Sequence, residues 1–96
     1  MDRYSILNNL DRCYFCKRPR QAIHEVYFGT ANRKISIKNG FCVGLCNEHH
    51  NMSNDSVHFN KAKDLELKQV YQKEYEKNHS REDFIKLIGR SYLWKN

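Results

Sequence analysis

The alternation of hydrophobic and polar positions predicts two short strands in the first half of the chain. Residues 21–29, "QAIHEVYFG", are rich in β-branched and aromatic residues and end in a glycine, which is typical of a strand. Residues 41–45, "FCVGL", form a second apolar run directly after Asn39-Gly40, a common turn pair. The basic stretch between them, "TANRKISIKNG", is interpreted as a connector. Together these segments predict an antiparallel hairpin.

The second half of the chain has a helical pattern. The segment "CNEHHNM" suffices for one or two helical turns before the breaker "SND", and residues 60 to about 78 then show apolar positions at partly helical spacing. We expect that helix to be exposed along most of one side. Ser80, followed three residues later by Asp83, resembles a capping box that begins a short helix ended by Gly89. The closing segment is expected to cover apolar surface with three side chains, Tyr92, Leu93 and Trp94.

The cysteines have the spacing of a zinc site. Cys13 and Cys16 stand in a turn-like knuckle, "CYFCKRPR", and Cys46 and His49 repeat the same two-residue gap downstream. Zinc takes four tetrahedral ligands from thiolates and imidazoles, so these four residues predict a structural Zn²⁺ site. The alternative is an all-thiolate site with Cys42 in place of His49. Cys42 falls within a predicted strand, where alternation could instead point it into the core.

The order of knuckle, hairpin and short helix is that of a treble clef. One ligand pair would come from the knuckle and the other from the start of the helix after the hairpin. We therefore expect a small zinc-bound α+β fold in one domain over residues 1–96. Residues 13–59 would carry the knuckle, hairpin and short helix, and residues 60–96 the C-terminal helices. With 40% apolar residues in so short a chain, the core gains much from a metal.

The charge balance favours a polyanionic partner. Lys and Arg number 17 against 11 Asp and Glu, a net charge of +6 that is spread along the chain. Nucleic acid is the commonest partner of such proteins. Five basic residues of the knuckle and connector are the candidate phosphate contacts: Arg18, Arg20, Arg33, Lys34 and Lys38.

Nothing in the sequence suggests a membrane segment. The first residues contain no apolar stretch, and the longest apolar run, "FCVGLC", is too short to cross a bilayer. We expect a soluble intracellular protein without a membrane partner. Disulfides are rare in reducing compartments, which favours metal binding over disulfide bonds for the four cysteines.

Four histidines remain once His49 is assigned to zinc, and His79, just before the Ser80 cap, is interpreted as a surface residue. His50 is the neighbour of His49 at the start of a helix, and adjacent helical residues point in different directions, so His50 must serve elsewhere. In an antiparallel hairpin His24 would lie across from His50, and His58 could reach the same place through the intervening loop. Three neutral imidazoles beside the carboxylate of Glu25 suit a second divalent cation.

These residues resemble the HNH nucleases of the ββα-metal, or His-Me finger, class in their zinc-stapled treble-clef form. The resemblance rests on "CYFC", "IHEVYFG", "NRK", "GLCNEHHN" and "VHF", covers most of the chain from Cys13 to about Leu93, and extends to small phage-encoded proteins of this type. It implies a ββα-metal core and metal-assisted hydrolysis of a DNA phosphodiester. The catalytic ion would be Mg²⁺, Mn²⁺ or a similar cation in addition to the structural Zn²⁺.

The resemblance also implies roles for individual residues. His50 and His58 match the metal ligands on the helix side of the site. Asn32, in "ANRK", matches the asparagine that braces the loop carrying the catalytic base, with Asn39 as the other candidate.

The sequence departs from the family pattern at "HEV" on the first strand. Aligned by Val26, His24 is a metal ligand and Glu25 takes the place of the base. Shifted by one residue, His24 is the base and Glu25 is a ligand or lies outside the site. The gap between His50 and His58 is also longer than usual. A non-catalytic zinc module that binds DNA or a protein is therefore the alternative function.

Overall fold

The centre of the molecule is a short antiparallel hairpin. In the computed structural model, which describes residues 2–93, strand β1 (Ala22–Glu25) pairs with strand β2 (Cys42–Leu45). In this register His24 lies opposite Val43. The predicted antiparallel pairing of the two strands is confirmed, although β1 is shorter than the apolar run that predicted it. Every residue of β2 is buried, so this strand belongs to the core.

Helix α1 (Asn32–Asn39) occupies the segment that we interpreted as a connector, and that interpretation was wrong. Its only buried residue is Ser36, whose hydroxyl donates to the carbonyl of Tyr27 at 2.6 Å and accepts from the Tyr27 amide at 3.1 Å. Gly40 ends the helix with a left-handed φ of 76°. The Asn39-Gly40 pair is therefore a helix terminus and not a hairpin turn.

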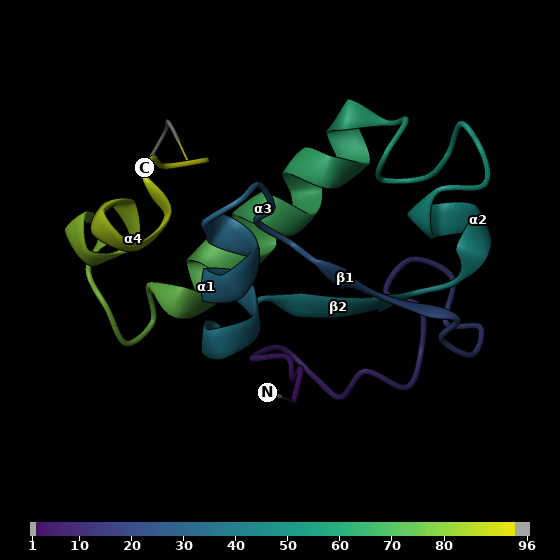
Figure 1. Cartoon of the computed structure of the whole chain (residues 1–96), viewed down its shortest axis with the longest axis horizontal. Coiled ribbons are helices and arrows are strands. Elements are labelled where there is room, and N and C mark those ends of the chain that lie inside the picture. The colour runs from purple at the N-terminus through teal and green to yellow at the C-terminus, as the bar shows by residue number, and fades with distance from the viewer. Residues whose placement is uncertain (1, 94–96) are drawn as a thin grey trace.

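Three further helices follow the hairpin (Figure 1). Helix α2 (Asn47–His50) is a single turn directly after β2, and helix α3 (Lys61–Tyr75) begins at Asn60, whose side chain accepts from two backbone amides. Helix α4 (Arg81–Ile88) has the predicted capping box and ends at Gly89, which adopts a left-handed φ of 109°. All three predicted helical segments are confirmed.

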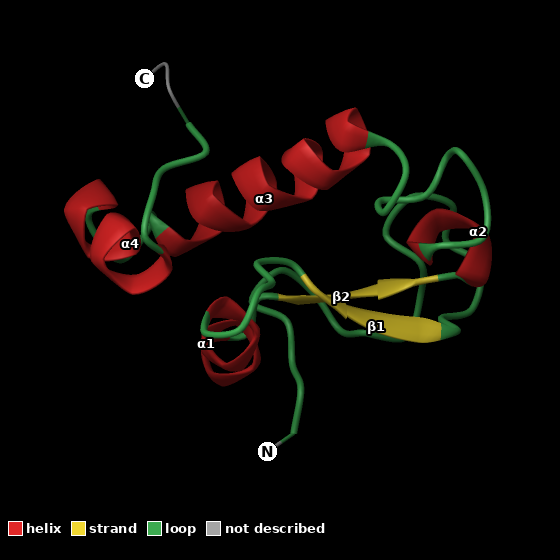
Figure 2. Cartoon of the chain, turned by 45° about the horizontal axis from the view of Figure 1, so that its top comes forward, coloured by secondary structure: helices red, strands yellow, loops and turns green. Residues whose placement is uncertain are grey.

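Helix α3 lies across one face of the hairpin, with α2 at one end of the strands and α1 and α4 towards the other end (Figure 2). It buries Leu67, Tyr71 and Gln72. Its exposed side is narrower than predicted, because only four of its residues are exposed: Lys61, Ala62, Glu66 and Lys73.

An aromatic cluster joins the hairpin to α4. The ring of Tyr27 lies 5.2 Å from that of Phe41 and 5.4 Å from that of Phe84, and all three side chains are fully buried. Edge-to-face contacts of this kind add to the free energy gained from apolar burial. The cluster forms one core with the hydrophobic residues of the knuckle, hairpin and helices.

The C-terminal segment folds back onto the helices at Tyr92 and Leu93, as predicted. The amide of Tyr92 donates to the buried Gln72 at 2.8 Å, and its ring lies 5.6 Å from that of Tyr27. The carbonyl of Leu93 accepts from Arg81 at 3.2 Å. Trp94, for which the same position was predicted, lies outside the described residues.

The N-terminal segment and α3 cover the outer edge of β2. A Cβ atom at Gly44 would lie 2.6 Å from the carbonyl oxygen of Leu10, so only glycine fits here. Three carbonyls on the side of β2 that faces away from β1 each accept a hydrogen bond. The amide of Ile6 donates to Gly40, the hydroxyl of Tyr71 to Cys42 and the amide of Tyr14 to Gly44.

The α+β class predicted from the sequence is confirmed by this arrangement of one two-stranded sheet and its helices. Within residues 2–93, no helix combines the length and the apolar character needed to cross a bilayer.

Two candidate metal centres

The first candidate centre lies where the knuckle meets α2. It brings together one ligand atom each from Cys13, Cys16, Cys46 and His49, all within 4.8 Å of one another. A left-handed φ of 67° at Lys17 and two backbone hydrogen bonds to Cys13 close the knuckle turn. Cys46 is the residue before the first turn of α2 and His49 lies one turn later, which directs both side chains toward the knuckle.

The distances in this cluster fit a tetrahedral zinc ion. The sulfurs of Cys16 and Cys46 are 3.7 Å apart, and the Nδ1 atom of His49 lies 3.3 Å from the sulfur of Cys46 and 3.5 Å from that of Cys13. Ordinary zinc bond lengths place tetrahedral ligands about 3.8 Å apart for two sulfurs and about 3.6 Å apart for sulfur and nitrogen. The four side chains could therefore hold a metal ion such as zinc.

Cys42 is not part of this cluster. Its side chain is fully buried on β2, and its sulfur donates to the carbonyl of Ser36 at 3.9 Å. Burial raises the pKa of the Cys42 thiol to about 11, which keeps it protonated at neutral pH. The structure thus brings together the mixed set with His49 and leaves the all-thiolate alternative without its fourth ligand.

The guanidinium of Arg18 lies against the thiol groups of the first centre. It donates to the sulfur of Cys16 at 3.1 Å, to that of Cys46 at 3.5 Å and to Glu48 at 3.1 Å. Burial alone would raise the pKa of the Cys16 thiol, but the hydrogen bonds from Arg18 outweigh it and lower that pKa to about 6. The thiolate is the form that binds metal. Arg18 was predicted as a phosphate contact, but its guanidinium group forms hydrogen bonds with the cysteines of the first centre.

A carboxylate supports the histidine of the first centre. With Nδ1 of His49 directed at the sulfurs, its Nε2 atom faces Asp55 at 3.5 Å. A carboxylate on the second ring nitrogen fixes the tautomer and orientation of a ligating histidine. Lys63 of α3 holds the other oxygen of Asp55 at 3.5 Å.

The second candidate centre consists of His24, His50 and His58. One ring nitrogen from each lies within 4.8 Å of the others, and the ring centroids are 4.9 to 5.5 Å apart. The side chains come from β1, from the last residue of α2 and from the loop after it. The amide of Val57 donates to the carbonyl of His49 at 2.8 Å, which returns this loop toward α2 and places His58 at the cluster.

The second centre offers neutral imidazoles to a cation. His24 is 5% exposed, and its buried Nε2 atom has no hydrogen-bond partner. Burial, helped by the neighbouring His50 and His58, lowers the pKa of His24 to about 3, and burial also lowers the pKa of His50. A buried polar atom without a partner costs free energy, which a bound ion would offset. The donor set and the unpaired nitrogen both fit a divalent metal.

A cavity of about 330 Å³ opens onto this cluster. Glu25 lies on its wall, but one carboxylate oxygen binds Arg3 at 2.6 Å and the other faces Arg33 at 3.7 Å. Glu25 is therefore beside the histidines and already paired with two guanidinium groups. The lining residues are Ile23, His24, Glu25, Phe28, Arg33, His50, Asn51 and His58.

Two residues that line this cavity, and a third that contacts its wall, were not predicted as site residues. Phe28 ends the predicted first strand and has no feature there that indicates a site, and Asn51 has no motif that distinguishes it from other polar loop residues. Arg3 reaches Glu25 from 22 positions away, a contact that no local pattern indicates.

Neither asparagine candidate contacts the histidine cluster. The side-chain amide of Asn32 donates to the carbonyl of Ile88 at 2.9 Å, and that of Asn39 donates to Ile35 in its own helix. Asn32 thus connects α1 to the end of α4 and does not brace a loop beside His24. Among the predicted phosphate contacts, Arg33 lines the cavity, and three others are exposed: Arg20, Lys34 and Lys38.

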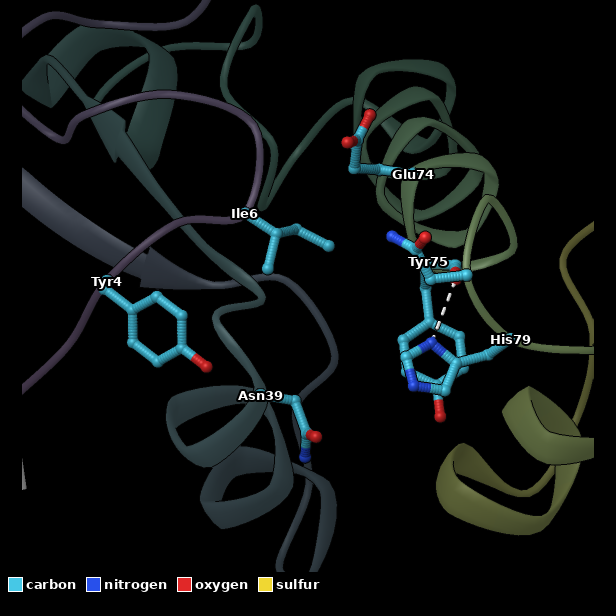
Figure 3. Close-up of a pocket in the computed structure, with 7 residues that line it drawn as sticks. Tyr4, Ile6, Asn39, Glu74, Tyr75 and His79 are labelled. Carbon is cyan, nitrogen blue, oxygen red and sulfur yellow. Dashed lines mark hydrogen bonds between the residues drawn. The ribbon is translucent and has the colours of Figure 1, made fainter.

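A second cavity, of about 380 Å³, lies between the N-terminal segment and the ends of α1 and α3 (Figure 3). The rings of Tyr75 and His79 are stacked there with centroids 4.1 Å apart, and Tyr4 lies on the opposite wall. None of the clustered cysteines and histidines lines this cavity.

Comparisons with known proteins identify no relative of this chain. No protein-family model matches it, and no curated protein or solved structure matches it. The two clusters are therefore the features of this chain that indicate a function.

Proposed function

We propose that this chain is a metal-dependent DNA endonuclease or nickase that hydrolyses phosphodiester bonds at His24, His50 and His58. The observation that carries the proposal is the convergence of these three imidazoles on one point, separate from a complete set of four zinc ligands. A small domain needs only one metal for stability, so a second cluster of metal-binding side chains beside an open cavity supports a catalytic role.

The first centre would hold a structural Zn²⁺ in a treble clef. The knuckle supplies Cys13 and Cys16, and the helix after the hairpin supplies Cys46 and His49, which is the order of ligands in that fold. The hairpin and α2 would then form the ββα-metal core of an HNH-type nuclease, with α1 inserted between the strands.

A Mg²⁺, Mn²⁺ or similar ion bound by the imidazoles would supply positive charge for the phosphate and the leaving oxygen. We assign His24 as the third ligand of this ion, because its ring converges with the other two and its buried Nε2 atom has no hydrogen-bond partner. Arg33 is 64% exposed on the cavity wall and is suited to contact a phosphate.

Glu25 is the candidate proton acceptor. Its longer contact is the one to Arg33, at 3.7 Å. A phosphate that draws Arg33 away would free this carboxylate oxygen beside the cavity.

The alternative is a non-catalytic zinc module that binds DNA or a protein. If all three histidines bind metal, Glu25 is the only remaining acid or base among the residues that line the cavity. Both of its carboxylate oxygens face guanidinium groups, which favours the alternative because no free base would remain. Such a module would bind DNA in a salt-dependent manner without cutting it.

A plasmid-nicking assay with Mg²⁺ or Mn²⁺ tests the proposal. We expect nicking by the wild type and a loss of at least about 100-fold in His24→Ala and in His50→Ala, since a lost ligand removes several kcal/mol of transition-state stabilisation. The matched control is His79→Ala, because this histidine stacks on Tyr75 away from the cluster. Equal nicking by all four proteins would refute the catalytic role, and DNA binding without nicking under either ion would establish the alternative.

A further inference from the structure

Three exposed apolar side chains lie close in the sequence to the clustered histidines. The described residues include five large hydrophobic side chains that are exposed: Tyr4, Phe28, Met52, Phe59 and Ile85. Phe28, Met52 and Phe59 follow a clustered histidine by four residues or fewer. Single exposed hydrophobic residues are ordinary on protein surfaces, so the argument depends on their position and not on their exposure.

Phe28 has the most informative position of the three. It lies on the wall of the histidine cavity, its side chain is 47% exposed, and its ring centroid is 6.0 Å from that of His24. A large apolar ring that contacts the cavity and remains open to solvent can receive a flat ligand beside the cluster.

The ring of Phe28 is held in place by a cation. The ammonium of Lys68, from α3, lies 4.3 Å from the ring centroid and pairs with Asp64 at 2.8 Å. The Lys68 side chain is only 13% exposed, so this contact is fixed by packing. Cation–π contacts contribute about 0.5–1 kcal/mol or more, which favours one orientation of the ring.

The cavity therefore combines an aromatic ring with positive charge. Arg33 lines the same cavity as Phe28, and the ammonium of Lys68 lies over the Phe28 ring. Proteins that bind single-stranded nucleic acid use this combination, since aromatic rings stack on bases while cations contact phosphates. In an intact duplex the faces of the bases are covered by their neighbours, and a base must leave the stack before a protein ring can contact it.

We propose that the histidine cavity takes DNA in which a base beside the cleaved phosphodiester is unpaired, and that Phe28 stacks on this base. The inference rests on the proposed nuclease function and narrows its substrate to single strands, mismatches, flaps or other distorted duplexes. Phe28 is then the residue that determines the preferred form of the DNA.

Binding to labelled DNA of about 16 nucleotides, the upper site size of one single-strand-binding fold, tests the proposal without cleavage. Fluorescence anisotropy is measured on zinc-loaded protein without added Mg²⁺ or Mn²⁺. We expect the single strand and the mismatched duplex to bind more tightly than the intact duplex. Phe28→Ala should weaken binding to the single strand by about five-fold or more, because stacking on one base contributes about 1–3 kcal/mol, and Phe28→Tyr should retain it.

Two controls separate stacking from a general loss of binding. Tyr4→Ala removes an aromatic residue of similar exposure, 49%, that lines the other cavity, and it should leave affinity unchanged. An abasic strand of the same length keeps the phosphates and lacks the bases, so Phe28→Ala should not change its affinity. Circular dichroism of each variant establishes that it is folded.

Several outcomes would overturn the inference: equal or tighter binding of the intact duplex, the same loss in Phe28→Ala and Tyr4→Ala, or a loss that persists on the abasic strand. The cleavage assay distinguishes this failure from that of the nuclease proposal. Cutting of intact duplex as fast as mismatched duplex would overturn the preference for unpaired bases and leave the nuclease intact. If Phe28→Ala weakens binding to the normal strand but not to the abasic strand, and the wild type cleaves none of the DNAs, the stacking role would be supported and the nuclease proposal refuted.

Discussion

His49 and His50 are adjacent in α2, yet their side chains belong to different clusters. Nδ1 of His49 lies 3.3 Å from the sulfur of Cys46, whereas the ring of His50 lies 5.5 Å from that of His24. One helical turn therefore connects the two centres. A change in the first centre that moves α2 must also move a ligand of the second.

The zinc assignment predicts opposite effects for two cysteines. Cys46→Ser should lose the metal and most of the stability of the fold, because structural zinc contributes on the order of 10 kcal/mol in small domains. Cys42→Ser should keep a full equivalent of zinc, since its sulfur lies outside the cluster. Metal content per chain and the thermal midpoint by circular dichroism measure both effects. Zinc retained by Cys46→Ser but lost by Cys42→Ser would contradict the ligand set.

Arg18 should tighten zinc binding through its contacts with two of the sulfurs. We expect Arg18→Ala to lower zinc affinity by about 10- to 100-fold, the usual effect of removing a partner of a metal ligand. Competition with a chromophoric chelator measures this affinity. The control is Arg20→Ala, an exposed arginine of the same knuckle that has no contact with the sulfurs among the described hydrogen bonds. Identical affinities of the two variants would show that Arg18 has no such role.

The two histidines of α2 should separate the two metals. His50→Ala should retain zinc and lose the binding of a second ion, whereas His49→Ala should lose both, because it disrupts the turn that carries His50. Zinc content together with Mn²⁺ binding, followed by calorimetry or electron paramagnetic resonance, distinguishes the variants. Undiminished Mn²⁺ binding by His50→Ala would remove this residue from the second centre.

Stability should depend on pH through Glu76 at the end of α3. Hydrogen bonds from Arg81, joined by one from Gln72, outweigh burial and lower the pKa of this carboxyl. A carboxyl whose pKa is lower in the folded state stabilises the protein above its unfolded pKa, about 4.3 for glutamate, and this contribution is lost as the pH falls through the folded value. Glu76→Gln should thus be destabilised by about 1 kcal/mol at pH 7.

The difference between Glu76→Gln and the wild type should shrink as the solution is acidified below the ordinary glutamate pKa. Urea unfolding at a series of pH values measures it. Glu74→Gln serves as the control, because Glu74 pairs with the exposed Lys77 and has no contact with Arg81 or Gln72 among the described hydrogen bonds. A difference that stays constant down to the acid limit would show that the carboxylate of Glu76 contributes nothing specific.

Local signals in the sequence were sufficient for much of the fold. The apolar runs around His24 and Val43 predict the hairpin, and the Ser80–Asp83 pair predicts the start of α4, since both depend on residues close in the chain. The segment that became α1 has only one buried residue, Ser36, and its stability depends on contacts with distant residues such as Tyr27, nine positions away, and Ile88 at the end of α4. Hydrophobic periodicity therefore could not predict it.

The composition of the two clusters could also be predicted, because ligand spacing and the geometry of adjacent helical residues are local properties. The partners of the surrounding side chains could not. Arg18 turns to the sulfurs, Asn32 to the end of α4 and Arg3 to Glu25. Each of these contacts depends on the folded positions of distant segments, so the sequence indicated the residue types and not their targets.

The covering of β2 has a consequence for the protein in a crowded solution. The edge strands of a sheet ordinarily present unpaired backbone groups, which can pair with a strand of another molecule and lead to aggregation. Here Ile6, Tyr14 and Tyr71 already occupy the outward carbonyls, and the chain passes too close to Gly44 for anything to be inserted. Residues 6–14 and Tyr71 thus shield this edge from pairing with another chain, and removal of residues 2–12 would expose the carbonyl of Gly40 and the backbone beside Gly44.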